Sequence, residues 1–329
     1  MSRPIVIAHR GASGYLPEHT LEAYARAIEL GADFIEPDLV ATADGGLIAR
    51  HENELSASTD VASRPGFAGR RCRKRVDGVE REGWFSEDFT LAEIRELRAR
   101  EPRPELRPAS AAHDGRYRVP ELREIVALAR DAGVGIYPET KSPSYFAREG
   151  RTHHGRGIGL SLGRLLVDVL VRERFVDPAR VFVQSFELGN LLELARVIMP
   201  AAGVRLPLVQ LFGRAGTVLH DLRHPHAPDA LHAALAAPMP EPVRSPHALA
   251  AMRAAYATAI GVPREQATDA LLAAARDAGL AVHAYTYRVE DHGSADAFVA
   301  AMSDDFARGV AAVFVDQPDL GRRAADRAG

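Results

Sequence analysis

The chain has 329 residues, of which 47% are hydrophobic and 26% are charged. This length suits one large α/β domain or two ordinary ones, and the composition allows a buried core. The net charge of −3 provides no global basic field, so nucleic acid is not expected as a partner.

The single cysteine, Cys72, excludes an internal disulfide. No segment has the apolar run of about 20 residues that spans a bilayer, so stable membrane insertion is not expected. Residues 1–4 lead directly into an apolar run, and no signal peptide is visible. A cytoplasmic protein is therefore predicted for the chain as given, or a periplasmic one if a leader was removed. The sequence leaves the oligomeric state open.

Short apolar runs, each followed by polar or glycine-rich residues, predict eight strands. The runs cover residues 5–9, 34–39, 47–51, 134–139, 181–185, 206–212, 281–286 and 312–316. Between most of them, apolar residues at i, i+3, i+4 and i+7 predict amphipathic helices. These helices are expected near residues 21–30, 120–132, 162–169, 188–195, 264–278 and 295–308.

Continuous apolar strands that alternate with amphipathic helices favour a parallel sheet covered by helices. Eight such strands suggest a closed (β/α)8 TIM barrel, and a doubly wound open sheet is the rival fold. We interpret residues 1–329 as a single domain of this kind.

Two long segments interrupt the alternation of strands and helices. Residues 52–119 are predicted to be an insertion after the third strand, with one short helix over 90–98 that begins at the capping box Thr90–Glu93. Residues 213–262 are predicted to be a long loop region between strands six and seven. Segments of this length are typical of functional lids or insertions.

Acidic residues belong to two of the predicted strands. Glu36 and Asp38 are two positions apart, so their side chains are expected on one face of a strand, and Glu139 ends the next accessible strand. Three carboxylates at the catalytic rim of a barrel suit a hard divalent cation, Ca²⁺ or Mg²⁺. The alternative for each acid is a salt bridge.

Basic residues stand beside these acids. Three carboxylates and one divalent cation carry a formal charge of −1, which Arg10 and Lys141 exceed by one positive charge. The surplus could bind a singly charged anion such as a phosphodiester, which arginine can hold in bidentate fashion. A carboxylate would also satisfy this charge count.

Two histidines end separate predicted strands. His9 and His51 could act as general base and general acid on opposite sides of a phosphorus atom, because imidazoles titrate near neutral pH. The alternative is that each is a hydrogen-bonded structural histidine. Tyr285 could offer an aromatic face to the carbon skeleton of a substrate, or fill the barrel.

These residues lie in stretches that resemble the glycerophosphodiester phosphodiesterase family. The matching stretches are HRGASGYLPEHTLEAY, DFIEPDLVATADGGLIARHE, VPELREIVALA, GIYPETKSP, VFVQSFE, LPLVQLF and AVFVDQPD. The combination of HRG, E-x-D and H-[DE] in this order is specific. Residues 52–119 resemble the insertion of the larger, periplasmic GlpQ-type branch.

The resemblance implies a TIM-barrel enzyme that hydrolyses glycerophosphodiesters, such as glycerophosphocholine and glycerophosphoethanolamine, to sn-glycerol 3-phosphate and an alcohol. It implies one bound divalent cation, Ca²⁺ in preference to Mg²⁺. The implied roles are metal ligands for Glu36, Asp38 and Glu139, acid–base catalysis for His9 and His51, and phosphate contacts for Arg10 and Lys141. The attack on phosphorus could form a cyclic phosphate or use water directly.

Three positions depart from the family pattern. Glu52 stands where the family often has Asp, Tyr285 where it usually has Trp, and His19 where it commonly has Asn. Two other functions stay open. One is a phospholipase-like phosphodiesterase acting on another lipid-derived phosphodiester, for which residues 52–119 are rather charged. The other is a non-catalytic barrel that binds a ligand.

Overall fold

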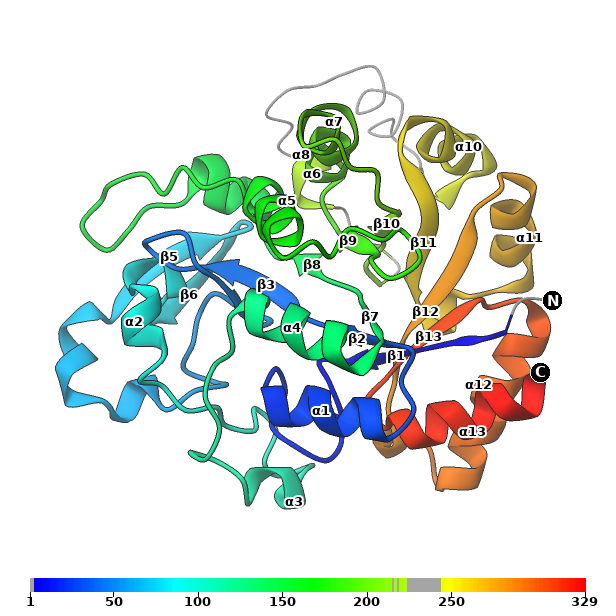
Figure 1. The fold of residues 1–329 in the computed structure, drawn as a ribbon, viewed down its shortest axis with the longest axis horizontal. Helices are drawn as coiled ribbons and strands as arrows, with labels where there is room; N and C mark the ends of the chain where they lie inside the picture. Colours follow the sequence, from blue (N-terminus) through cyan, green and yellow to red (C-terminus); the bar gives the residue numbers. More distant parts are fainter. Residues whose placement is uncertain (1–2, 215, 218, 224–243) are drawn as a thin grey trace.

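Parallel strands close into a barrel at the centre of the molecule (Figure 1). The computed structural model describes residues 3–214, 216–217, 219–223 and 244–329. β1 (Ile5–His9) pairs with β2 (Phe34–Glu36) on one side and with β13 (Ala312–Val315) on the other. The sheet continues through β7 (Gly135–Ile136), β8 (Glu139–Thr140), β9 (Val183–Ser185), β10 (Leu208–Leu211), β11 (Ala257–Pro263) and β12 (Ala281–Tyr287).

Prolines divide two of the barrel strands. Pro37 separates β2 from β3 (Asp38–Ala41), and Pro138 lies between β7 and β8. Proline has no N–H to donate to a ladder, so the pairing is interrupted there. β2 pairs with β7 and β3 pairs with β8, so these four segments act as two strands that join the ends of the sheet. The predicted TIM barrel is confirmed, and the open sheet is excluded.

One barrel strand differs from the prediction. The run predicted over 47–51 forms β4 (Leu47–Ala49), which pairs antiparallel with β3 and is not part of the parallel barrel. The eighth barrel position belongs instead to β11, which lies in the region 213–262 that was predicted to be a loop. Gly261 and Pro263 within β11 are residues that usually indicate a turn. That region also holds α8 (His220–Arg223) and α10 (Pro246–Ala255), while its residues 215, 218 and 224–243 lie outside the described residues.

Helices surround the barrel (Figure 1). The helix predicted over 295–308 is present as α12 with the same bounds, and Gly133 ends α4 in the left-handed conformation, as a helix-terminating glycine should. A final helix, α13, was not predicted. The helices are α1 (Leu21–Glu29), α4 (Leu122–Ala132), α5 (Leu162–Arg172), α6 (Leu188–Glu193), α7 (Met199–Ala201), α11 (Asp269–Asp277), α12 (Ala295–Arg308) and α13 (Pro318–Ala328).

The segment between β4 and α4 has its own small elements, at the left and bottom of Figure 1. They are the antiparallel pair β5 (Cys72–Val76) and β6 (Val79–Gly83), and the short helices α2 (Leu91–Ile94) and α3 (Pro108–Ala111). The predicted helix over 90–98 is therefore shorter than expected. The boundaries 52–119 and the single-domain interpretation stay predictions.

The capping box at the start of α2 is present as predicted. Thr90 Oγ1 accepts a hydrogen bond from the Glu93 backbone N–H at 3.3 Å, and Glu93 Oε2 accepts one from the Thr90 N–H at 2.8 Å. The substitution Thr90→Ala is expected to lower the free energy of unfolding by about 1 kcal/mol, because it removes this cap. Chemical denaturation measures the change. Thr90→Ser keeps the hydroxyl and should stay within about 0.5 kcal/mol of the parent protein; equal losses in both variants would contradict the role of the cap.

An apolar layer fills the barrel interior and supports the polar residues above it. This layer contains Ile7, Phe34, Tyr137, Val209, Ala259, Ala312 and Phe314. Side chains of a strand alternate between its faces, so a residue two positions later points to the same side. Four polar residues stand two positions after a member of the layer: His9, Glu36, Glu139 and Asp316. They therefore face the barrel axis at the C-terminal ends of the strands.

Candidate active site

A cavity of about 680 Å³ opens at the C-terminal ends of the barrel strands. Every residue that the sequence predicted for the site lines it. These residues are His9, Arg10, Glu36, Asp38, His51, Glu139, Lys141 and Tyr285. Their co-location places acids, bases and cations within one concave surface, which is where TIM barrels hold their catalytic groups. The individual roles stay predictions.

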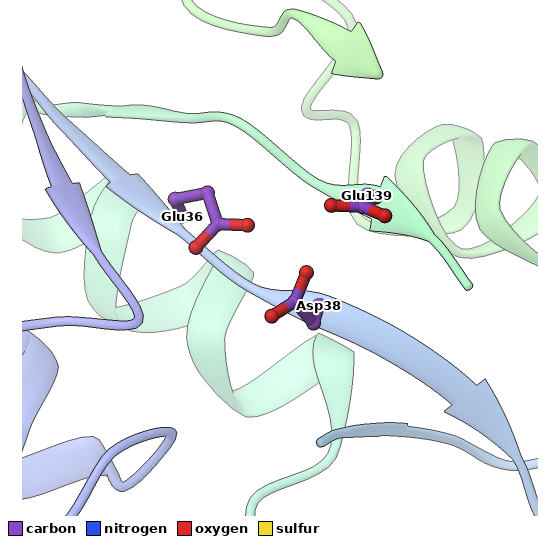
Figure 2. Close-up of side chains that lie close together, drawn as sticks. All are labelled: Glu36, Asp38 and Glu139. Atoms are coloured by element: carbon purple, nitrogen blue, oxygen red, sulfur yellow. The ribbon is translucent and has the colours of Figure 1, made fainter. Parts of the chain in front are cut away.

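Three carboxylates converge in this cavity (Figure 2). Glu36 ends β2 and Asp38 begins β3, on either side of Pro37, and Glu139 is the strand neighbour of Asp38 in β8. One oxygen from each lies within 4.8 Å of the others. The residues are 2%, 1% and 6% exposed, respectively. Three buried acids at this separation repel one another unless a cation compensates them.

The pKa values of the acids reflect their burial and the charges around them. Burial, together with the charges of Asp38 and Glu139, raises the pKa of Glu36 well above its usual range. Burial and the neighbouring Asp38 raise the pKa of Glu139 to about 8, although Lys141 opposes the change. Burial also disfavours ionisation of Asp38, but Lys141 and a hydrogen bond from His19 outweigh it and hold the pKa of Asp38 well below its usual range. The protein thus provides too little positive charge to ionise all three, and an all-oxygen set of this kind fits a hard divalent cation.

His9 is held by a buried carboxylate. Its Nδ1 lies 2.6 Å from Oδ1 of Asp316, which is fully buried. If the proton of the neutral imidazole is on Nδ1 and is donated to Asp316 in a hydrogen bond, Nε2 is the acceptor atom of the ring. Burial and the charge of Arg10 lower the pKa of His9 to about 4, so the ring is neutral at pH 7.

His51 reaches the cavity by a different route from the predicted strand end. It follows β4, and the backbone N–H of Arg50 donates to the Asp38 carbonyl at 2.9 Å, which brings the chain beside the three carboxylates. Nδ1 of His51 lies 2.9 Å from Oε1 of Glu52. Desolvation in the cavity, with Arg10 and Lys141 nearby, lowers the pKa of His51 to about 4.

Two cations border the carboxylates. Nη1 of Arg10 donates to Glu18 at 2.9 Å, and Nε lies 3.3 Å from Asp38 Oδ2. Nζ of Lys141 lies 2.9 Å from Glu139 Oε1 and 3.9 Å from Asp38 Oδ1. Both side chains line the cavity, so an anion that entered it would meet them.

Tyr285 belongs to both the packing and the cavity wall. Its ring lies edge-on to Phe186 and to Phe314, with 6.3 Å between ring centroids in each pair. Its hydroxyl donates to the carbonyl of Phe212. Filling of the barrel and an aromatic face for the substrate are therefore compatible interpretations of Tyr285.

Several residues around the site were given no role from the sequence. Gln184 Nε2 donates to Glu36 Oε1 at 3.1 Å, and His19 Nε2 lies 3.0 Å from Asp38 Oδ2. Asp316 supports His9, and Arg107 contacts Asp316. Gln184 and Asp316 each follow an apolar run, so their position was a usable signal. Nothing local in the sequence connects Arg107 with a strand that lies about two hundred residues away.

Comparison with known proteins shows the family of the chain. Residues 9–320 match the model of the "Glycerophosphoryl diester phosphodiesterase family". The chain belongs to this family. Curated relatives of the chain are named glycerophosphodiester phosphodiesterases. GDPD6 of Arabidopsis thaliana is 35% identical over 202 residues, and the protein of Haemophilus influenzae is 35% identical over 227 residues. These alignments cover 60% and 64% of this chain, and 54% and 57% of the relatives, so the chain matches little more than half of their lengths.

Solved structures of the family share the fold. A putative glycerophosphoryl diester phosphodiesterase from Silicibacter pomeroyi DSS-3 superposes with a TM-score of 0.67 at 23% identity, over 100% of this chain and 95% of that one. A phosphodiesterase from Oleispira antarctica, solved in complex with the product sn-glycerol-3-phosphate, superposes with a TM-score of 0.64 at 19% identity, over 98% of this chain and 97% of that one. At these identities the likeness establishes the fold alone. Among the described residues, no helix has both the length and the hydropathy needed to cross a membrane.

Proposed function

We propose that the protein hydrolyses glycerophosphodiesters, such as glycerophosphocholine and glycerophosphoethanolamine, to sn-glycerol 3-phosphate and an alcohol. One observation carries the proposal: three converging carboxylates share a single cavity with two histidines, each paired with its own carboxylate. The family match supports it, and so do the names of the curated relatives.

Glu36, Asp38 and Glu139 would hold one divalent cation. Such an ion, when bound, stabilises negative charge on a phosphate oxygen and lowers the pKa of a hydroxyl group. We propose Ca²⁺ in preference to Mg²⁺, in line with the branch that the sequence resembles. The donor set is consistent with both, since each ion prefers oxygen ligands.

The side chains around the acids would bind and orient the phosphodiester. Arg10 and Lys141 would attract its phosphate oxygens. His9, neutral and with Nε2 as acceptor, would take the proton from the attacking hydroxyl group. His51 would donate a proton to the departing alcohol, because the anionic phosphate beside it favours the protonated imidazole.

The attacking oxygen can come from the substrate or from water. If the neighbouring glycerol hydroxyl attacks phosphorus, its proton passes to His9, the phosphorus–oxygen bond to the alcohol breaks, and a cyclic phosphate forms. Water then opens the ring with the two histidines in exchanged roles. If water attacks directly, sn-glycerol 3-phosphate forms in one step.

The experiment that tests this function follows the release of sn-glycerol 3-phosphate from glycerophosphocholine. Metal-stripped protein is assayed alone, with Ca²⁺ and with Mg²⁺, and intact phosphatidylcholine is the comparison substrate. We expect release from glycerophosphocholine that depends on the added ion and is greater with Ca²⁺. Absence of release with both ions, from protein shown to be folded, would refute the proposal; faster hydrolysis of phosphatidylcholine would favour the phospholipase alternative.

A further inference from the structure

Arg107 reaches from the segment before α3 to the end of the last barrel strand. It is 5% exposed, and its guanidinium group contacts three different acceptors. Nη1 donates to the Ser13 carbonyl at 2.8 Å, Nε donates to Glu290 Oε1 at 2.6 Å, and Nη2 donates to the Asp316 carboxylate. Three acceptors in different directions hold a planar guanidinium in one orientation.

The contact divides the two oxygens of Asp316 between different partners. Oδ1 faces His9 Nδ1 at 2.6 Å, whereas Oδ2 accepts from Arg107 and, at 3.1 Å, from Arg288 Nε. With both oxygens engaged, the carboxylate can neither rotate nor withdraw from the imidazole without breaking a charge-assisted hydrogen bond. The orientation of His9 therefore depends on the two arginines that hold Oδ2 of Asp316.

Arg107 is not itself among the described residues that line the cavity, although His9 and Arg288 are. A substrate in the cavity would accordingly meet His9 but not Arg107. Any influence of Arg107 on the reaction must therefore pass through the residues that it contacts, of which Asp316 is the one whose side chain faces the His9 imidazole.

The other histidine has a similar but more exposed support. Arg81 Nη2 lies 3.2 Å from Glu52 Oε2, and Glu52 Oε1 lies 2.9 Å from His51. The side chains of Arg81 and Glu52 are 38% and 40% exposed, against 4% and 1% for Arg107 and Asp316. Exposed ion pairs contribute little because water screens them, so the buried pair is the one expected to matter.

We propose that Arg107 is a positioning residue for the hydrolysis: it fixes the Asp316 carboxylate, which in turn holds His9 with its Nε2 directed for proton transfer. The proposal rests on the proposed function, and it gives the segment 52–119 a direct part in organising the site. It also explains why an arginine of that segment is buried against β13 and the loop after β12.

The first test replaces Arg107 by glutamine. We expect kcat for glycerophosphocholine to fall roughly 10- to 100-fold, because a small misplacement of a proton-transferring group has an effect of this size. KM should stay within about twofold, because no substrate contact is lost. Arg107→Lys keeps the charge but cannot reach all three acceptors. Its kcat should lie between that of the glutamine variant and that of the parent protein.

Arg180→Gln is the matched control. Arg180 is a half-buried arginine whose Nη2 donates to the carbonyls of Ala129 and Val134, away from the cavity. It should lower the melting temperature without changing kcat. If Arg107→Gln changes only the melting temperature, or raises KM with kcat intact, the proposal is overturned.

A double-mutant cycle separates positioning from general damage. If Arg107 acts through Asp316, then the double variant Arg107→Gln/Asp316→Asn should have nearly the same kcat as Asp316→Asn alone. Independent, multiplicative losses would contradict the proposal.

A spectroscopic readout does not need activity. The Nδ1–H proton of His9, assigned by its absence in His9→Gln, should give a downfield NMR signal in the parent protein that shifts or is lost in Arg107→Gln. A signal that is unchanged by Arg107→Gln would overturn the proposal for Arg107. This test is independent of activity, whereas a parent protein that hydrolyses no glycerophosphodiester would refute the proposed function.

Discussion

Replacing His9 by glutamine is expected to lower kcat for glycerophosphocholine hydrolysis by about 10²- to 10⁴-fold, the usual loss when a general base is removed. Glutamine can still contact Asp316 but has no basic nitrogen to accept a proton. The phosphate contacts proposed for Arg10 and Lys141 remain, so KM should change little. Steady-state measurement of sn-glycerol 3-phosphate release determines both constants.

His113→Gln is the control for this substitution. His113 is half-buried in the segment 52–119, where its Nδ1 lies 3.0 Å from the Tyr117 hydroxyl, and it is not among the residues that line the cavity. Its replacement should leave kcat unchanged. A His9→Gln enzyme with undiminished turnover would remove His9 from the mechanism, whatever the result for His51.

Replacing Glu139 by glutamine is expected to stabilise the metal-free protein at pH 8. The pKa of Glu139 in the folded protein is about 8, against an ordinary value of 4.5. A carboxyl group whose pKa is raised by folding favours the folded state while protonated, and this stability is lost as the pH rises from 4.5 to about 8. The melting temperature of the metal-free parent protein should therefore fall across this range, and that of the variant should fall less.

Added Ca²⁺ should reverse the order of the melting temperatures, so that the parent protein becomes more stable than Glu139→Gln. A cation held by the three carboxylates stabilises the folded state by mass action, so the parent protein should gain melting temperature with Ca²⁺ concentration. Glu139→Gln loses one charged ligand and should gain much less. Glu101→Gln is the control, because Glu101 is also buried with a raised pKa but lies with Ser110, outside the cluster of three acids. If Ca²⁺ raises the melting temperature of all three proteins equally, the ion binds elsewhere.

Much of the site could be predicted from the sequence because the relevant pattern is local. In β1, Ile7 and His9 are two positions apart, and the same spacing relates Phe34 to Glu36. An apolar run that ends in a polar residue on the same face describes a strand whose lower part is in the barrel interior and whose upper part reaches the site. This pattern can be recognised in the sequence without knowledge of which strands lie next to it.

The strand order could not be predicted in this way. The apolar segment β4 turns back on β3, while β11, which contains Gly261 and Pro263, completes the barrel between β10 and β12. The composition of a segment is the same whichever strand it pairs with, and its partner is chosen by the closure of the whole sheet. The predicted number of barrel strands was therefore right, although β4 was predicted in the place that β11 occupies.

The sequence alone determined the fold class, the family resemblance and the set of chemically active residues, because each depends on short patterns along the chain. Only the tertiary structure showed that Asp316 supports His9 and that Arg107, 209 positions before it, holds Asp316. The physical reason is that a buried ion pair needs a partner in space and not in sequence. An isolated arginine in a charged segment has no local feature to distinguish it from its exposed neighbours.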